Sequence, residues 1–253
     1  GVNGTATSSN GAAVRTPAGL KKDWGGKGGG SSSGAVGPRS TLAVAAGDTV
    51  VDATTRLGAP GFVNGHMHMY GVLSHGITTD ALVTNFSNFL DDFWWPYVEN
   101  RVDRPLAGLT ARWAAVEMIR SGITSFTDIV EAPNAIRGVL EAEAAEIEKA
   151  GRRAVLYVGA CQRMSEENAQ QGLKENADFV RAHNKDGALV QGLMCVHTLF
   201  TGDKDYMKQA KAMAKELGCD IHMHMSESVF EPNWTQEHYG KTPVDVYDEI
   251  GFL

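Results

Sequence analysis

The chain has 253 residues, a formal net charge of −7 and three cysteines. This length allows one sizeable hydrophobic core, or one domain with part of a second. The acidic balance argues against a nucleic-acid-binding surface, and the odd cysteine count without paired spacing argues against a disulfide framework. No apolar run reaches the length of a membrane span. The composition therefore predicts a cytoplasmic globular protein that binds neither nucleic acid nor membranes.

Residues 1–40 are dominated by glycine, serine, alanine and asparagine, with the run Gly25–Ser33 at the centre. Such a segment buries too little apolar surface to offset its ordering entropy, so we expect it to be disordered. A glycine loop that cradles phosphate is the functional alternative. That loop requires a strand before it and a helix after it, and the sequence indicates neither. Residues 41–59 contain one strand-like run, 49–53, and the main domain is expected over residues 60–253.

Strand-like and helix-like segments alternate in the main domain. Strands are predicted at 61–64, 123–128, 153–158, 188–196 and 219–225, and helices at 103–121, 134–150, 166–184, 203–217 and 242–250. The helix over 103–121 is indicated by apolar residues that fall near one face: Leu106, Leu109, Trp113, Val116 and Ile119. This alternation, with a repeat of roughly 30–40 residues, is typical of βαβ units in a parallel sheet.

Polar residues stand at the C-terminal ends of successive predicted strands: His66 and His68, then Asp128, His197 and His224. The active site of a TIM barrel lies at this rim, and catalytic residues come from several different strands. A doubly wound sheet is the competing fold, but it would concentrate the site at one switch point. We therefore predict an α/β protein of the (β/α)8 TIM-barrel type.

Two His-x-His pairs are the strongest chemical signal in the chain, His66-Met67-His68 and His222-Met223-His224. Residues i and i+2 of a strand project from the same face, so each pair aims two imidazoles at one place. Imidazole is the commonest metal-binding side chain near neutral pH. The pairs therefore predict one metal centre assembled from distant parts of the chain, in preference to satisfied core histidines.

The residues around the second pair have less certain roles. Glu227 follows His224 by three positions, where a carboxylate could accept a proton from an activated water and pass it to a leaving group. A helix N-terminal carboxylate is the structural alternative for Glu227. His197 is equally well explained as a structural imidazole or as a substrate contact. His222 either supports the ligands from behind or is displaced by a local bend.

The run Pro60-Gly61-Phe62-Val63-Asn64-Gly65-His66-Met67-His68 resembles the first-strand signature of the amidohydrolase superfamily. Residues 122–128 and 224–227 match later landmarks of its cytosine deaminase-like branch, which contains S-adenosylhomocysteine deaminases, guanine deaminases and triazine chlorohydrolases. The aromatic stretch 88–96 is similar to the lid of that branch, especially in aminohydrolases linked to selenium metabolism. The resemblance covers about residues 35–253.

The resemblance implies that His66, His68 and His224 ligate one divalent metal ion, with zinc the first candidate and iron the second. It implies that Glu227 shuttles the proton and that His197 contacts the substrate. No lysine ends the fourth strand near His197, which implies a mononuclear site. The implied reaction is hydrolytic deamination of an amino-substituted purine, pyrimidine or triazine by metal-bound hydroxide. Release of a halide is the second choice.

In the family, a histidine on the sixth strand and an aspartate on the eighth complete the site, and both would lie beyond Leu253. We therefore expect about the first five β/α units of the barrel, with residues 41–59 as the remnant of an N-terminal β-sandwich. Such a fragment would hold zinc weakly through three histidines. The alternative function is a non-catalytic metal-binding fragment, or a partner-dependent subunit of a split amidohydrolase. Homo-oligomerisation is left open.

Overall fold

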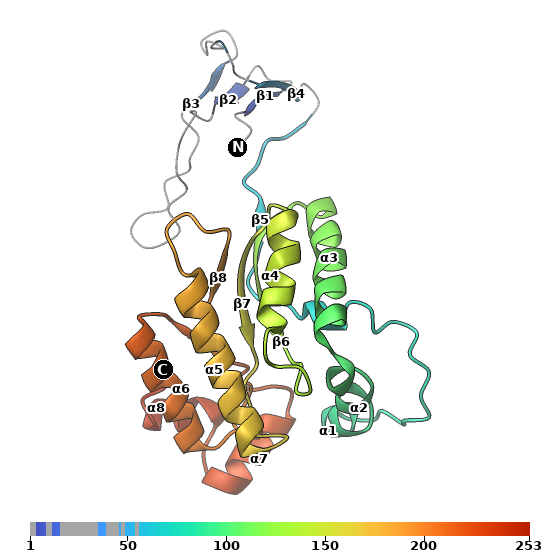
Figure 1. Ribbon diagram of the computed structural model, residues 1–253, viewed down its shortest axis with the longest axis vertical. Helices are drawn as coiled ribbons and strands as arrows, with labels where there is room; N and C mark the ends of the chain where they lie inside the picture. The colour runs from blue at the N-terminus through green and yellow to red at the C-terminus, as the bar shows by residue number, and fades with distance from the viewer. Residues whose placement is uncertain (1–3, 9–11, 16–34, 39–45, 47–48, 54–55) are drawn as a thin grey trace. The chain divides into compact units, whose positions relative to one another are not determined.

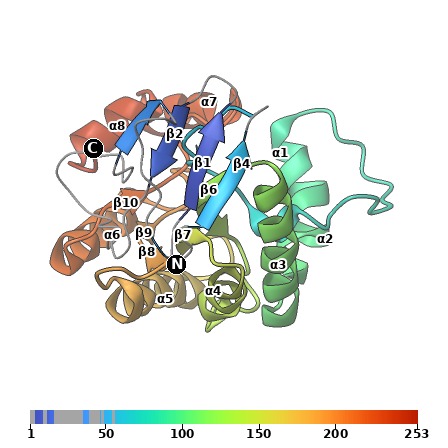
Figure 2. The same ribbon diagram turned by 90° about the horizontal axis from the view of Figure 1, so that it is seen from above.

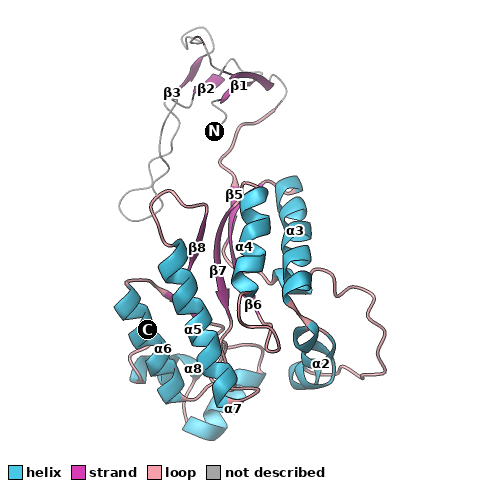
Figure 3. Cartoon of the chain, viewed as in Figure 1, coloured by secondary structure: helices cyan, strands magenta, loops and turns pink. Residues whose placement is uncertain are grey.

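The computed structural model describes residues 4–8, 12–15, 35–38, 46, 49–53 and 56–253. The chain divides into two compact units, Gly1–Gly61 and Phe62–Leu253. Figure 1 labels the elements of both units, and Figure 3 distinguishes their helices from their strands.

The first unit contains a four-stranded sheet in the order β3-β2-β1-β4. Its strands are β1 (Gly4–Ser8), β2 (Ala12–Arg15), β3 (Ala35–Pro38) and β4 (Thr49–Ala53). Three of these strands lie within residues 1–40, for which disorder or loose attachment was predicted, and β4 lies within the segment 41–59. Strand β1 pairs in parallel with β4, from Gly4 opposite Thr49 onward, and local composition does not reveal such a distant partner. The run 25–33 lies outside the described residues.

The second unit is built on parallel strands. β5 (Phe62–Asn64), β6 (Ile123–Val130), β7 (Arg153–Val158) and β8 (Val190–Gly192) form one sheet in that order. β9 (Met194–Cys195) continues the line of β8 and pairs in parallel with β10 (Ile221–His222). β8 and β9 together occupy the strand predicted at 188–196. The five strand positions follow chain order and all run the same way, as in the first five positions of a TIM barrel.

At least one helix follows each of the five strand positions of the second unit. The bounds are α3 (Arg104–Arg120), α4 (Val139–Lys149), α5 (Glu166–His183), α6 (Lys204–Leu217), α7 (Phe230–Tyr239) and α8 (Pro243–Glu249). Figure 2 shows α3 to α6 following one another along the outer side of the strands. Polar N-cap side chains begin four of these helices: Asp103, Ser165, Asp203 and Thr242. The predicted alternation of strand and helix is confirmed.

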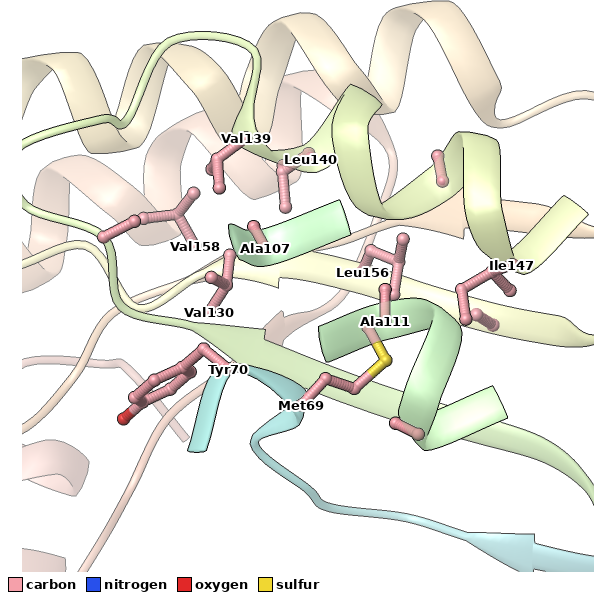
Figure 4. Packing of buried hydrophobic residues seen from close by; sticks show 14 of the residues in the cluster. Met69, Tyr70, Ala107, Ala111, Val130, Val139, Leu140, Ile147, Leu156 and Val158 are labelled. Atoms are coloured by element: carbon pink, nitrogen blue, oxygen red, sulfur yellow. The ribbon is translucent and has the colours of Figure 1, made fainter. Parts of the chain in front are cut away.

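The main hydrophobic core lies between the strands and helices α3 and α4 (Figure 4). Ala107, Ala111 and Ala114 are fully buried on the inner face of α3, where small side chains allow the helix to approach the sheet closely. The apolar residues that indicated this helix lie on its outer face instead. Trp113 and Val116, for example, keep about half of their surface exposed (52% and 49%). The helix was therefore predicted correctly from a face that does not pack inward.

The connection between β5 and α3 contains short helical turns that the sequence did not predict. They are Met69–Gly71, α1 (Phe86–Phe89), a π-helix (Leu90–Trp94), α2 (Trp95–Tyr97) and Glu99–Arg101. Aromatic rings in this segment stack on one another, with the Phe89 and Trp94 ring centroids 5.5 Å apart. These contacts make the stretch a packed aromatic cluster.

Two further facts bear on the environment of the protein. Cys161, Cys195 and Cys219 are free thiols. Among the described residues, no helix has both the length and the apolar character needed to cross a membrane.

Glu143 on α4 is a fully buried carboxylate to which no described residue donates a hydrogen bond. Burial raises the pKa of Glu143 well above its ordinary value, and the neighbouring Asp128 and Glu131 carboxylates raise it further. The unfolded chain therefore gives up this proton at a lower pH than the folded chain does. As a result, the stability contribution of Glu143 is full below the ordinary glutamate pKa and is lost as the pH rises above it.

The substitution Glu143→Gln is expected to remove this pH-dependent cost. At pH 8 the free energy of unfolding should rise by at least about 1 kcal/mol, whereas at pH 4 it should change little, because both side chains are then neutral. For a chain of this size the gain corresponds to about 2–4 °C in Tm. Thermal unfolding of both proteins at the two pH values checks this, and an equal shift at both would contradict it.

Candidate metal centre

The residues predicted to carry the chemistry gather at the C-terminal ends of the barrel strands. His66 and His68 follow β5, His197 follows β9, and His224 and Glu227 follow β10. Because neighbouring strands are parallel, these ends share one edge of the sheet. Residues 156 positions apart in sequence thereby come into contact there.

His66, His68 and His224 converge on one point. One ring nitrogen from each of the three lies within 4.8 Å of the others. The Nε2 atoms of His68 and His224 are 3.3 Å apart, and their rings are nearly parallel, with an interplanar angle of 11°. The ring of His66 stands edge-on to both, with centroid distances of 5.0 Å.

This separation fits a zinc ion. Two nitrogen ligands about 2.0–2.1 Å from zinc, at a tetrahedral angle, lie about 3.3–3.4 Å from each other. His68 donates its Nδ1 proton to the carbonyl oxygen of Ile129 at 3.0 Å, so its Nε2 carries a lone pair toward His224. Three imidazoles that face a common point form, once their facing nitrogens are deprotonated, a donor set suited to a borderline-soft cation such as zinc.

The segment after β5 is attached to β6 by four hydrogen bonds, one of which runs from the Thr127 hydroxyl to Gly65 O at 2.6 Å. Besides the bond from His68 Nδ1, Ile129 N donates to Met67 O at 3.0 Å. Met69 N donates to the Asp128 carboxylate at 2.6 Å. Asp128 therefore neither caps a helix nor faces the histidines, but fixes the backbone just after His68. The first His-x-His pair is thus held by a neighbouring strand rather than by its own short strand.

His222 lies beside the three converging histidines and outside their common point. Its Nε2 is 3.2 Å from Nδ1 of His66, and its ring stacks on Tyr157 at a centroid distance of 5.2 Å. The second His-x-His pair is therefore unequal, with His224 turned toward the common point and His222 supporting His66.

His197 is buried next to His224, with ring centroids 4.9 Å apart. Its Nδ1 lies 3.0 Å from the Thr201 hydroxyl and 3.1 Å from the Thr198 hydroxyl, which leaves Nε2 as its free nitrogen. Burial lowers the pKa of His197 to about 4. The side chain is therefore a neutral imidazole with one nitrogen available to the site.

Glu227 occupies an unusual stretch of backbone. The residues on either side of it, Ser226 and Ser228, both have left-handed φ angles, 59° and 58°. Non-glycine residues rarely adopt this conformation, and such strain clusters at functional sites. Burial raises the pKa of Glu227 to about 7, and no described residue makes a hydrogen bond to its Oε2 atom. The carboxyl group can therefore exchange a proton near neutral pH.

Two carboxylates near the histidines did not emerge from the sequence. Glu231, in the unpredicted helix α7, accepts hydrogen bonds from the backbone amides of Leu199 and Glu227 and so joins two site loops. Glu131, just after β6, lies 3.4 Å from His68 Nδ1. Burial alone would lower the pKa of His68, but Glu131, together with Asp128 and the Ile129 carbonyl, raises it to about 9. Side chains of a strand alternate between its two faces, so Glu131 lies on the same face as Ile129, two residues earlier. This alternation was the signal that could have predicted Glu131.

Glu99, in the short turn before α3, is engaged by protein groups. Its Oε1 accepts a hydrogen bond from the Tyr70 hydroxyl at 3.3 Å, and its Oε2 pairs with Arg163 at 3.0 Å. The guanidinium group of Arg163 also lies over the ring of Trp95, 4.6 Å from its centroid. These contacts give Glu99 a structural role between the aromatic cluster and the loop after β7.

The chain is similar to proteins of known sequence. Residues 59–253 match the model of the amidohydrolase family. The chain is 28% identical over 213 residues to the 5'-deoxyadenosine deaminase of Methanosphaera stadtmanae, an alignment that covers 84% of this chain and 48% of that protein. It is 31% identical over 207 residues to the 5-methylthioadenosine/S-adenosylhomocysteine deaminase of Thermococcus sibiricus, covering 81% and 46%. The chain thus spans about half the length of these relatives.

Solved structures have the same fold. An adenosine deaminase from Xanthomonas campestris with bound zinc aligns at a TM-score of 0.75 and 19% identity, over 99% of this chain and 55% of that chain. A zinc complex of atrazine chlorohydrolase from Arthrobacter aurescens aligns at a TM-score of 0.73 and 14% identity, over 95% and 54%. With the sequence match covering residues 59–253, the chain belongs to the amidohydrolase family.

Proposed function

We propose that the protein is a metal-dependent hydrolase of C–N bonds that removes the amino group from a nitrogen heterocycle. The observation that carries the proposal is the convergence of His66, His68 and His224, with His68 and His224 at the nitrogen separation of a zinc site. Membership of the amidohydrolase family supports the reaction class.

In this proposal the three converging histidines hold one divalent ion, with zinc the first choice and iron the second. Solved neighbours with bound zinc support that order. When bound, such an ion supplies Lewis acidity, which lowers the pKa of water and makes it nucleophilic at neutral pH.

The remaining steps belong to Glu227 and His197. Glu227 accepts one proton of the attacking water and gives it to the ring nitrogen, where the product keeps it. It then carries the second proton of that water from the hydroxyl on the reacting carbon to the amino group, which leaves as ammonia; a pKa near neutrality suits both transfers. His197, held through Nδ1 by two threonine hydroxyls, presents Nε2 to the heterocycle and orients it. Glu231 keeps the loops that carry both residues in register.

The substrate class follows from the relatives. Proteins named as deaminases of 5'-deoxyadenosine and of 5-methylthioadenosine or S-adenosylhomocysteine support an adenosine-type purine as the first candidate. Pyrimidines and triazines are the next candidates. Three free thiols support a reducing compartment, so we expect the protein to act in the cytoplasm, and homo-oligomerisation stays a prediction.

Ammonia release from a panel of amino-heterocycles tests the proposal. The panel should include 5'-deoxyadenosine, 5'-methylthioadenosine, guanine, cytosine and an aminotriazine, with chloride release from a chlorotriazine measured in parallel. Zinc-loaded protein is expected to deaminate at least one of them, most readily an adenosine. Protein that binds metal but releases neither product from any compound would support the non-catalytic metal-binding alternative instead.

A further inference from the structure

Glu131 is a buried carboxylate beside the metal centre whose role the proposed reaction does not include. It directly follows β6 and keeps only 5% of its surface exposed. No group in the described part of the chain makes a hydrogen bond to either of its oxygens. A buried, unpartnered carboxylate is costly, so its retention requires an explanation.

Imidazoles surround this carboxylate. Its Oε2 atom is 3.4 Å from Nδ1 of His68, the nitrogen that also donates to the Ile129 carbonyl. One of its oxygens also lies within 4.8 Å of a ring nitrogen of His197 and of His224. The negative charge of Glu131 is therefore placed among three imidazoles of the site.

The chain leaves space for this carboxylate at Gly159, just after β7. A Cβ atom at Gly159 would lie 2.3 Å from Oε1 of Glu131 and 3.1 Å from its carboxyl carbon. The backbone of Gly159 is not in the left-handed region, so the contact alone excludes a side chain there. Glu131 can therefore occupy its position only because Gly159, just after the neighbouring strand β7, has no side chain.

The other buried carboxylates of this region lack these contacts. Asp128 is bonded to a backbone amide, and Glu99 is paired with Arg163. Glu143 is as deeply buried as Glu131 and equally unpartnered, but it lies on helix α4, and no histidine contributes to its electrostatic surroundings. Glu131 differs from these carboxylates because its oxygens lie next to imidazole nitrogens.

We propose that Glu131 is a positioning residue of the metal centre that acts through His68, an inference that rests on the proposed function. Its carboxylate gives His68 Nδ1–H a second acceptor beside Ile129 O and holds the ring with Nε2 toward His224. Its charge also offsets part of the charge of the bound cation. Carboxylates behind ligating histidines raise metal affinity in this way.

Zinc affinity, measured by competition with a chromophoric chelator, tests the inference. Glu131→Gln is expected to bind zinc about 10–100-fold more weakly than the unaltered protein. Gly159→Ala should weaken binding to a similar extent, because it displaces the same carboxylate. The double variant should be no weaker than the weaker single variant, since both changes act on one interaction. Glu143→Gln, the matched control, should bind zinc as the unaltered protein does.

A spectroscopic readout separates positioning from a general loss of structure. With cobalt in place of zinc, Glu131→Gln should shift the visible absorption bands of the bound ion, whereas Glu143→Gln should leave them in place. Unaltered affinity and spectrum in Glu131→Gln would overturn the inference while the metal site itself stands. Additive losses in the double variant would also overturn it. Failure of the unaltered protein to bind zinc would overturn the proposed function and this inference together.

Discussion

Replacing His68 with alanine is expected to remove the bound metal and reduce ammonia release to the background rate. His68 is the best-fixed of the three converging histidines, because Nδ1 donates to Ile129 O and Nε2 lies 3.3 Å from His224. The substitution leaves two imidazoles, too few to hold zinc against solvent, since protein zinc sites use at least three protein ligands. Metal content by mass spectrometry should fall from about one equivalent to near zero.

His183→Ala is the matched control for this experiment. The His183 ring packs on Phe179 and its Nε2 pairs with Glu141 on the helical side of the second unit, with no contact to the converging histidines. The control should keep both metal and turnover. If His68→Ala kept its zinc equivalent, the assignment of His68 as a ligand would be wrong and the proposed site would have to move.

The sequence predicted most of the second unit because its elements are locally encoded. The strand at Arg153–Val158 has the predicted bounds, and the helix over 166–184 is met by Glu166–His183, which begins at the cap Ser165. The two His-x-His pairs were visible for the same reason, since strand alternation sets which side chains share a face. The sequence analysis also treated His222 and His224 differently, with His222 as a support of the ligands or as a residue displaced by a bend.

The features that escaped prediction depend on distant partners. Strand β1 exists through its pairing with β4, and Gly159 is required by a carboxylate that belongs to another strand. Helix α7 was missed because no side-chain cap marks its start. The helix also tolerates Pro232 in its first turn, although proline in a sequence usually indicates a helix end. Its Glu231 nevertheless links the loops of His197 and Glu227. Local patterns therefore indicated which histidines converge, while long-range contacts determine how these histidines are held.

The arrangement explains how a short first strand can carry two ligands. β5 has three residues, and Phe62 and Val63 are about 70% exposed, so it contributes little rigidity. Hydrogen bonds that join Met67, His68 and Met69 to β6 compensate for this, with Met67 O accepting from Ile129 N. β6 is an inner strand, paired with β5 on one side and β7 on the other. The His66–His68 segment is therefore held rigid by its hydrogen bonds to this inner strand.

Replacing Glu227 with glutamine is expected to lower kcat for deamination by about 10²–10⁴-fold while leaving the zinc content unchanged. An amide of nearly the same shape cannot accept the proton of the attacking water, but the three converging histidines are untouched. Measurement of kcat together with metal content separates this effect from that of His68→Ala, which should lose both. Glu237→Gln, on the exposed side of α7, is the control and should keep full activity.

The pH dependence of the unaltered enzyme gives an independent check on Glu227. Burial raises the pKa of Glu227 to about 7, and only the ionised form can accept a proton, so kcat should fall as the pH drops below that range. A bound cation stabilises the carboxylate and moves this acidic limb to lower pH, never to higher. Glu227→Gln should lose the limb altogether. A variant that kept both the limb and most of its activity would show that another group moves the proton, and the two serines with left-handed φ angles beside Glu227 would then need a different explanation.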